Sequence, residues 1–177
     1  MTSCYNIYMK KIIIGSDHAG FAIKEALKPF LEEMGYEVKD CGPAEYNPED
    51  DYPDYISPVA KEISKHAGTE KGIILGASGQ GEAMVANKFP HVRAAVYYGF
   101  GLEQGKHDAK KAELEALTSM QIIELSRLHN DANVLSLGAK FIDADEAKAA
   151  VKLWLETPFS GEARHQRRLD EIEKIKI

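Results

Sequence analysis

The sequence predicts an α/β protein, a three-layer sandwich in which a five-stranded parallel sheet of Rossmann-like type is covered by helices on both faces. Five short apolar runs of strand character alternate with segments of helical periodicity along the 177 residues. Strands that alternate with helices in this way form parallel sheets with both faces buried. The apolar share of 44% and the chain length suit one substantial core. We therefore expect residues 10–177 to form a single domain with a helical tail, and residues 1–9 to be a flexible leader.

Each expected strand is a short apolar run between turn residues, and each expected helix carries apolar residues at helical spacing. Gly35 stands where the first helix should end, and Ser57-Pro58 suits the start of the second. Asp143 suits a helix cap, and Pro158 should end the helix that follows it. Strands are expected over residues 11–14, 36–40, 72–75, 93–98 and 133–137, and helices over 21–34, 54–66, 82–88, 112–128, 146–156 and 162–177.

Composition and charge exclude several classes of protein. The formal net charge of −6 argues against general binding of nucleic acid. No apolar run approaches the roughly 20 residues of a membrane span, and the first residues lack the basic and apolar regions of a signal peptide. The two cysteines, Cys4 and Cys41, make a disulfide framework improbable, so we expect a reducing cytoplasm.

The segment from Gly76 to Lys88 is the most informative stretch of the chain. It follows an apolar strand, places three glycines within six residues, and then enters a helix-prone run at Glu82. Glycines at a strand-to-helix turn let the backbone approach a ligand closely, and the free N–H groups of the first helical turn favour an anion. This loop therefore offers an anion cradle beside a carboxylate.

Three familiar glycine motifs do not fit. A dinucleotide fingerprint would need a third glycine where Met84 stands, and a P-loop would need Lys-Ser/Thr where Phe21-Ala22 follows Gly20. A hydrolase elbow would need a glycine at Gln80. The loop is thus a glycine cradle without nucleotide or triad machinery.

Ligands of doubly wound folds bind beyond the carboxyl ends of the strands. We therefore expect the site among the turns after the first, third and fourth strands and in the segment that enters the fifth. Asp17 and His18 follow the first strand, whereas His129 and Asn130 precede the fifth. On the residues alone, these four are equally suited to turns, caps and surface positions. A metal site formed by Asp17, His18, His129 and Asp131 is also open, although no two of these residues form a helical i, i+4 ligand pair.

Five stretches, in order along the chain, give the sequence a specific likeness. The chain resembles the type B ribose-5-phosphate isomerases, within the wider group that includes galactose-6-phosphate isomerase subunits, from about Lys10 to the C-terminus. The five stretches are Ile14-Gly-Ser-Asp-His-Ala-Gly-Phe21, Asp51-Tyr-Pro-Asp54, Gly79-Gln-Gly-Glu-Ala-Met-Val-Ala-Asn-Lys88, Arg127-Leu-His-Asn-Asp-Ala-Asn133 and Arg164-His-Gln-Arg-Arg168.

The resemblance implies an aldose–ketose isomerase that needs no metal or organic cofactor. Isomerisation through an enediolate requires a base near C1 and C2 and donors where the oxyanion develops. One branch of the family uses a glutamate at the position of Glu82, and the other uses a cysteine at the position of Gly76, so Glu82 is the expected base. The expected donors to the enediolate oxygen are Ser78 and the backbone of Gly79, Gln80 and Gly81.

The resemblance also implies the residues that bind the substrate. Asp17 would bind sugar hydroxyls and His18 the ring or the phosphate. His129, with an unperturbed pKa near 6.5, would open the furanose ring, and Asn130 would bind a hydroxyl beside it. The phosphate would be held by Arg164 and Arg168, which lie four residues apart on one helical face, and by Lys140, where many relatives carry an arginine.

Other readings of the same residues remain open. Glu82 also suits the helix dipole, an effect of about 0.3–1 kcal/mol, and the two tail arginines also suit a solvated basic face. A helix N-terminus favours an ionised Glu82, whereas burial favours a neutral one. The segment 99–119 looks longer than usual for the family, and we expect it to tune substrate size or subunit contacts.

The resemblance implies a homodimer, or a dimer of dimers, with active sites shared between subunits and a small sugar phosphate as substrate. The preferred sugar is open among ribose 5-phosphate, galactose 6-phosphate and allose 6-phosphate. A non-catalytic sugar-phosphate-binding domain on the same scaffold is the alternative from a different class. It would need the glycine cradle and the arginines but not Glu82, Asp17 and His129 together.

Overall fold

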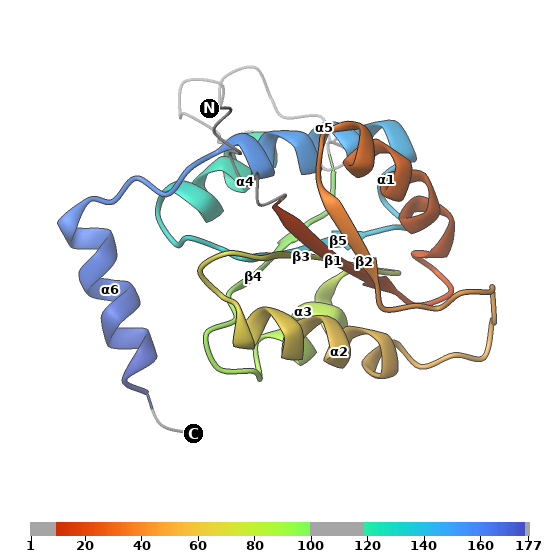
Figure 1. The fold of residues 1–177 in the computed structure, drawn as a ribbon, viewed down its shortest axis with the longest axis horizontal. Coiled ribbons are helices and arrows are strands. Elements are labelled where there is room, and N and C mark those ends of the chain that lie inside the picture. The colour runs from red at the N-terminus through yellow and green to blue at the C-terminus, as the bar shows by residue number, and fades with distance from the viewer. Residues whose placement is uncertain (1–9, 100–118, 176–177) are drawn as a thin grey trace, which may run out of the picture.

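The computed structural model describes residues 10–99 and 119–175 and shows the expected three-layer α/β sandwich (Figure 1). The proposed leader, residues 1–9, and most of the segment 99–119 lie outside the described residues. Five strands form one parallel sheet in the order β2-β1-β3-β5-β4. They are β1 (Lys11–Ser16), β2 (Glu37–Asp40), β3 (Lys71–Gly76), β4 (Ala94–Tyr97) and β5 (Val134–Gly138).

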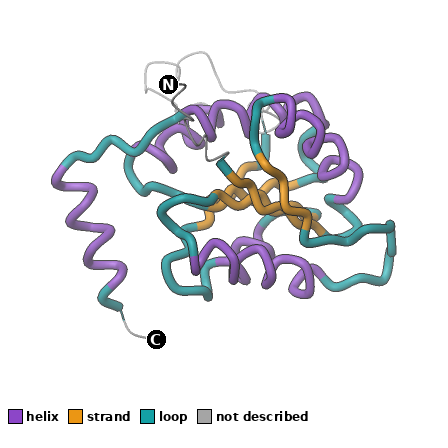
Figure 2. Tube along the Cα trace, viewed as in Figure 1, coloured by secondary structure: helices purple, strands orange, loops and turns teal. Residues whose placement is uncertain are grey.

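The helices cover the sheet on both sides, as the alternating pattern predicted (Figures 1 and 2). Two apolar cores result, because successive residues of a strand point to opposite faces. Ile12 and Ile14 of β1 face one core and Ile13 faces the other. α1 (Phe21–Glu33), α4 (Ser119–Leu128) and α5 (Ala144–Glu156) lie on the first face, and α2 (Tyr52–Lys65) and α3 (Gln80–Ala86) lie on the second.

Local signals predicted most element boundaries. Gly35 ends the first helical segment with φ +86°, a conformation that glycine adopts without strain. Asp143 caps α5, its side chain accepting a hydrogen bond from the N–H of Glu146 at 2.9 Å. The expected start of α2 at Ser57-Pro58 was wrong. The helix begins at Tyr52 with Pro53 in its first turn, where a missing N–H costs nothing, and Pro58 lies inside the helix.

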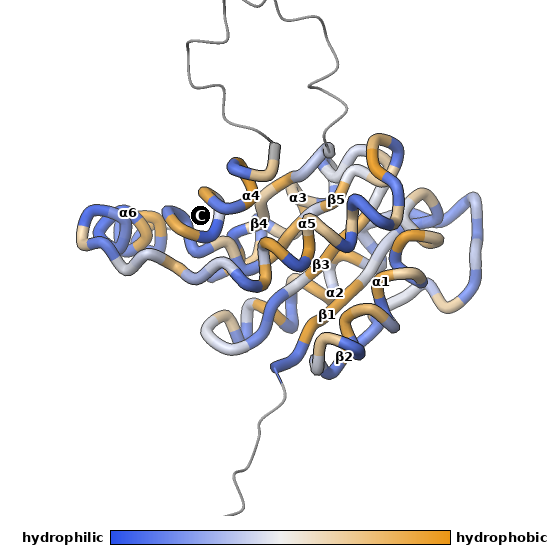
Figure 3. The backbone as a smooth tube through the Cα atoms, turned by 90° about the horizontal axis from the view of Figure 1, so that it is seen from above, coloured by the Kyte–Doolittle hydropathy of each residue, from blue (hydrophilic) through white to orange (hydrophobic). Residues whose placement is uncertain are grey.

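The last helix, α6 (Ala163–Glu173), stands to one side of the sandwich (Figure 1). Figure 3 shows hydrophobic residues along the central strands β1 and β3 and largely hydrophilic ones on α6. Within α6 only His165 and Leu169 are buried, and Glu173 anchors the far end by a hydrogen bond with His91 at 2.6 Å and an ion pair with Arg93 at 3.4 Å. This helix therefore adds little to either core and presents most of its charged surface outward.

Candidate functional site

The order of the strands creates a topological switch point at the carboxyl ends of β1 and β3. The connection that leaves β1 passes to one side of the sheet and the connection that leaves β3 passes to the other. Ligands of such sheets bind at this switch point. Asp17 directly follows β1, and its backbone N–H donates to the carbonyl of Leu75 in β3 at 3.2 Å. The turn after β1 and the glycine loop after β3 therefore meet at the switch point.

The glycine loop is fixed against β5. Gly79 has φ +74°, which only glycine adopts readily, and a Cβ there would approach Gly138 N and the Ser136 hydroxyl oxygen at 3.2 Å. Ser136 donates a hydrogen bond of 2.6 Å to the carbonyl of Gly79. These contacts hold the turn rigid and direct α3 away from the sheet edge.

Glu82 lies in the first turn of α3 and is buried, with 4% of its surface exposed. Its carboxylate occupies the space beside Gly76, since a Cβ built on that glycine would lie 1.7 Å from Oε1. Within the described part of the chain, Oε2 is buried without a hydrogen-bond partner. A buried carboxylate oxygen without a hydrogen-bond partner, beside a loop of glycines, is suited to act as a general base.

Burial raises the pKa of Glu82 above its ordinary value, and the charge of Asp17 raises it further. Hydrogen bonds from the backbone of Glu82 and Gly79 act in the opposite direction and are weaker in sum. The net direction is upward, and desolvation is the largest single cause.

Asp50 positions His18, a contact that the sequence did not predict. Its Oδ1 accepts from the backbone N–H of His18 at 3.0 Å and lies 2.7 Å from the ring atom Nδ1. This hydrogen bond raises the pKa of His18, and the charges of Asp17 and Asp50 add to the effect. Asp50 lies in the polar loop after β2, one residue before the Asp-Tyr-Pro-Asp stretch, and that neighbourhood was the available signal.

Asp17 is engaged in its own turn, and Tyr52 closes over the glycine loop. Oδ1 of Asp17 accepts from the N–H groups of Ala19 and Gly20 at 2.9 and 3.1 Å. The aromatic ring and hydroxyl of Tyr52 come within 2.8–2.9 Å of where a Cβ on Gly81 would be, so only glycine fits beneath it. Sequence analysis did not single out Tyr52 for the site, because its contact with the loop depends on how α2 packs.

Ser78 and Lys140 complete this edge of the sheet. The hydroxyl of Ser78 accepts from the N–H of Gln80 at 3.3 Å, which is the local role that a turn serine often has. The backbone N–H of Lys140 donates to the carbonyl of Ala77 at 3.1 Å, and its charge lowers the pKa of His18. Lys140 is therefore a cation at the carboxyl edge, near His18.

His129 and Asn130 lie at the opposite edge of the sheet. They form the turn between α4 and the start of β5, whereas the glycine loop lies where β3 and β5 end. β5 has five residues, so its two ends are roughly 16 Å apart at about 3.3 Å per residue. Within one chain the segment that enters the fifth strand therefore does not join the other turns, because a strand begins and ends at opposite edges of the sheet.

The tail brings its basic side chains to this second edge. Arg164 and Arg168 are both exposed on α6, and Nε of Arg164 pairs with Glu162 at 2.8 Å. His165, between them, stacks on His129 with ring centroids 4.2 Å apart and planes 10° apart. His165 is 3% exposed and its Nε2 has no hydrogen-bond partner in the described chain. Burial lowers the pKa of His165, and His129 lowers it further.

His165 is thus a further site candidate, to which no role was assigned from the sequence. A histidine within a charged helix resembles any surface histidine, and only the contact between α6 and the α4–β5 turn sets it apart. The structure therefore sorts the predicted residues into two groups, which we call the carboxyl-edge group and the tail group. The carboxyl-edge group is Asp17, His18, Ser78, Gly79, Gln80, Gly81, Glu82 and Lys140, and the tail group is His129, Asn130, Arg164 and Arg168.

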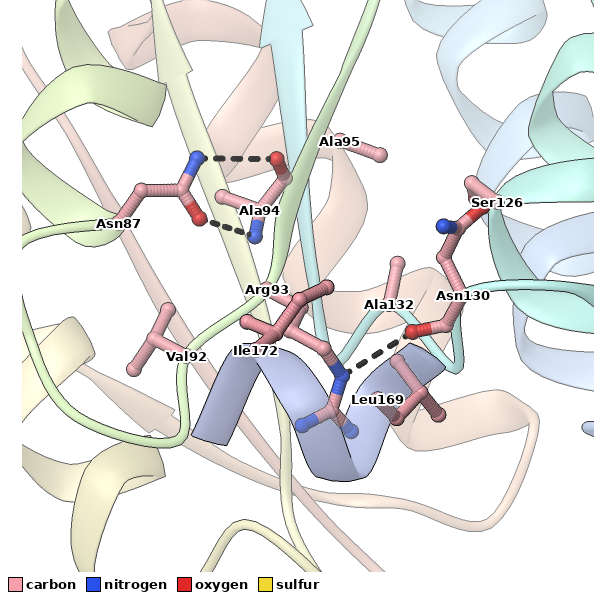
Figure 4. A pocket seen from close by; sticks show the side chains of 10 residues that line it. All are labelled: Asn87, Val92, Arg93, Ala94, Ala95, Ser126, Asn130, Ala132, Leu169 and Ile172. Atoms are coloured by element: carbon pink, nitrogen blue, oxygen red, sulfur yellow. Dashed lines mark hydrogen bonds between the residues drawn. The ribbon is translucent and has the colours of Figure 1, made fainter. Parts of the chain in front are cut away.

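A hollow of about 410 Å³ adjoins the tail group between β4, α4 and α6 (Figure 4). Apolar side chains, including those of Val92, Leu169 and Ile172, form much of its lining. Nε of Arg93 donates to the backbone carbonyl of Asn130 at 3.0 Å at its border. No residue of the carboxyl-edge group lines this hollow.

Two kinds of feature are absent from the described residues. Across 10–99 and 119–175, no group of three His, Cys, Asp or Glu side chains could hold a metal ion. Within the same residues, no helix is long and apolar enough to cross a membrane.

The fold and the carboxyl-edge group define a parallel α/β protein with a buried carboxylate at its switch point. Comparison with known proteins then identifies its family. Residues 12–100 and 110–172 match the profile of the ribose/galactose isomerase family. The chain belongs to this family.

Several relatives are named as ribose-5-phosphate isomerases. Ribose-5-phosphate isomerase B of Mycobacterium tuberculosis is 34% identical over 160 residues, which cover 90% of this chain and 86% of the relative. Ribose-5-phosphate isomerase B of Escherichia coli is 34% identical over 167 residues, which cover 94% of this chain and 97% of the relative. The crystal structure of the Mycoplasma genitalium enzyme with bound ribulose 5-phosphate superposes with a TM-score of 0.80 at 32% identity, over 94% of this chain and 97% of that chain.

Proposed function

We propose that this protein interconverts ribose 5-phosphate and ribulose 5-phosphate through an enediolate. The observation that carries the proposal is the buried carboxylate of Glu82 beside Gly76, with a raised pKa and an unpartnered oxygen. Relatives that cover nearly the whole chain carry this activity in their names. A general base works best when its pKa lies closer to the operating pH than that of an ordinary carboxylate, and burial of Glu82 acts in this direction.

The reaction moves one proton between two carbons. Glu82 takes the proton from C2 of the open-chain aldose, the C1–C2 double bond forms, and the carbonyl oxygen on C1 becomes the enediolate oxyanion. A proton then passes from the hydroxyl on C2 to the oxygen on C1, Glu82 returns its proton to C1, and the oxygen on C2 becomes the ketose carbonyl. The N–H groups of residues 79–81 and the hydroxyl of Ser78 would donate to the oxyanion, because they surround the first turn of α3. Asp17 would bind a sugar hydroxyl.

The remaining steps use the tail group. His129 would donate a proton to the ring oxygen when the furanose opens, Asn130 would bind a hydroxyl, and the two tail arginines would hold the phosphate. Lys140 would add a positive charge from the carboxyl edge, near His18. The planar guanidinium group of arginine can donate two hydrogen bonds to one phosphate, which the ammonium group of lysine does less well. We therefore infer that the arginines of α6 are the main phosphate-binding residues.

We infer a homodimer, or a dimer of such dimers, in which each site takes one group from each chain. In one chain the two groups lie at opposite edges of the sheet, so a single chain cannot bring Glu82 to the same sugar as His129. A two-fold axis would place the tail group of each chain beside the carboxyl-edge group of the other chain, and would therefore form two equivalent sites in one dimer. The outward position of α6 and its small buried surface suit a helix that meets a second copy (Figure 1).

Complementation tests the shared site directly. Glu82→Gln chains are mixed with Arg168→Ala chains under conditions that exchange subunits. Each hybrid dimer would contain one intact site, so random mixing should restore about a quarter of wild-type activity. The matched control mixes Glu82→Gln with Asp17→Asn, which both lie in the carboxyl-edge group and should restore nothing. Proven hybrid dimers without recovery in the first mixture would refute the shared site.

A panel of aldose phosphates tests the substrate. We expect ribose 5-phosphate to give the highest kcat/KM, and galactose 6-phosphate and allose 6-phosphate are the competing substrates, the first because the family includes galactose isomerases. Binding of these sugars without turnover of any would instead identify a non-catalytic sugar-phosphate-binding domain. We also infer a cytoplasmic setting, consistent with the free thiol of Cys41.

A further inference from the structure

A second recess lies at the amino edge of the sheet, where β1 and β3 begin. It has a volume of about 360 Å³, within the range of small-molecule sites. Its lining includes the side chains of Lys10, Lys11, Lys71 and Arg127 but only one acidic residue, Glu156. This local excess of positive charge contrasts with the formal net charge of −6 of the chain.

Two of the four cations are already paired. Lys11 lies 3.3 Å from a carboxylate oxygen of Glu37. Arg127 pairs with Asp131 at 2.7 Å and also donates to the backbone carbonyls of Ala132 and Thr157. These two side chains shape the recess and leave little hydrogen-bonding capacity for a ligand.

Lys71 and Lys10 are not paired. Neither ammonium group has a hydrogen bond or an ion pair within residues 10–99 and 119–175, and Lys71 is half-buried. Burial lowers the pKa of Lys71 and the charge of Arg127 lowers it further, whereas the charge of Asp131 acts in the opposite direction. An ammonium group in a recess without an acceptor is unfavourable, and an anion beside it would offset that cost.

The rest of the wall is apolar or aromatic. Ile12, Leu155 and Phe159 line the recess together with the ring of Tyr36. A cationic end and an apolar side fit a ligand that has both an oxyanion and a short organic part. The plainer explanation is that the lysines only offset the negative carboxyl ends of α2 and α5 nearby. This role needs no bound anion, so the protection experiment below distinguishes it from a binding site.

We propose that this recess binds a small oxyanion, either inorganic phosphate or a phosphate monoester, with Lys71 as its principal contact and Lys10 at its mouth. The site is separate from the catalytic site of the proposed function and does not depend on it. It lies at the start of β3, whereas the glycine loop and Glu82 follow the end of that strand. It also uses none of the residues assigned to the tail group.

Trace acylation of the lysines, quantified for each residue by mass spectrometry, tests the proposal on the intact protein. Inorganic phosphate and glycerol 3-phosphate are the two probes, and chloride at matched ionic strength controls for screening. Each anion that binds should slow the acylation of Lys71 several-fold and saturably. Lys61, an exposed lysine of α2 without an ion pair, is the matched control and should not respond. Protection by the monoester at lower concentration would show that the organic part contributes.

Two variants separate this recess from the catalytic site. Protection of Lys71 should persist in Arg168→Ala protein, whose proposed catalytic phosphate grip is lost. Lys71→Met protein should fold, since the change removes an unpaired cation, and equilibrium dialysis should show one phosphate fewer bound per chain than in the wild type. Unchanged acylation of Lys71 with both anions overturns the proposal. Loss of protection in the Arg168→Ala protein also overturns it, because the phosphate would then belong to the catalytic site.

Discussion

Replacing Gly76 with alanine should displace the proposed base without removing it. The new Cβ would lie 1.7 Å from Oε1 of Glu82 and 2.2 Å from Cδ, and a real Cβ essentially never comes within 3.0 Å of a neighbour. Oε1 must therefore move by at least 1.3 Å. A displacement of about 1 Å costs on the order of 10²-fold in rate, so kcat should fall by about that factor, which corresponds to roughly 2.7 kcal/mol at 1.36 kcal/mol per tenfold change.

The fold should survive this substitution, because the alanine meets the end of a flexible side chain rather than backbone. A coupled isomerase assay measures kcat and KM, and the thermal midpoint of unfolding verifies the fold. Gly68→Ala is the control, since nothing lies within 4 Å of a Cβ at that glycine and its φ is ordinary. A Gly76→Ala enzyme that is folded and keeps near-normal turnover would show that the position of the Glu82 carboxylate does not matter.

A rescue experiment extends the same reasoning. One branch of the family uses a cysteine where this chain has Gly76, and the Glu82 carboxylate occupies the space that such a side chain would need. Combining Gly76→Cys with Glu82→Ala removes the clash and places a thiol near the same point. The double variant should turn over substrate faster than Glu82→Ala alone. Equal rates for the two would mean that proximity to Gly76 is incidental.

Three further predictions concern Glu82 and His165. Glu82→Gln should lower kcat at least ~10²-fold, and unchanged turnover would contradict the role of Glu82 as base. The same variant should be more stable to heat at neutral pH, because the pKa of Glu82 is raised in the folded protein and its ionisation therefore destabilises the fold as pH rises through that pKa. The acid limb of kcat/KM should report a pKa above 4.5 that disappears in Glu82→Gln; a limb at or below that value would refute the desolvated base. His165→Ala should reduce kcat/KM for the ring-closed sugar more than His165→Phe, which keeps the stack on His129; equal losses would leave no role for stacking.

The sequence by itself determined the fold class, the number of strands and most boundaries, because these depend on local chemistry. The alternation of apolar runs and helical stripes required a parallel sheet with both faces buried, and Gly35 and Asp143 marked helix boundaries through conformation and capping. Ordered short motifs also identified Glu82 and the glycine loop. Such motifs can be read from one chain because each combines a backbone requirement with a chemical group.

Only the tertiary structure decided which predicted residues lie together. Strand order is not encoded by local spacing, and the insertion of β5 between β3 and β4 places Lys140 beside the glycine loop and His129 at the far edge. The contact of Asp50 with His18 joins residues 32 positions apart. The burial that raises the pKa of Glu82 is likewise a tertiary property, because it depends on how completely neighbouring elements exclude water from that carboxylate.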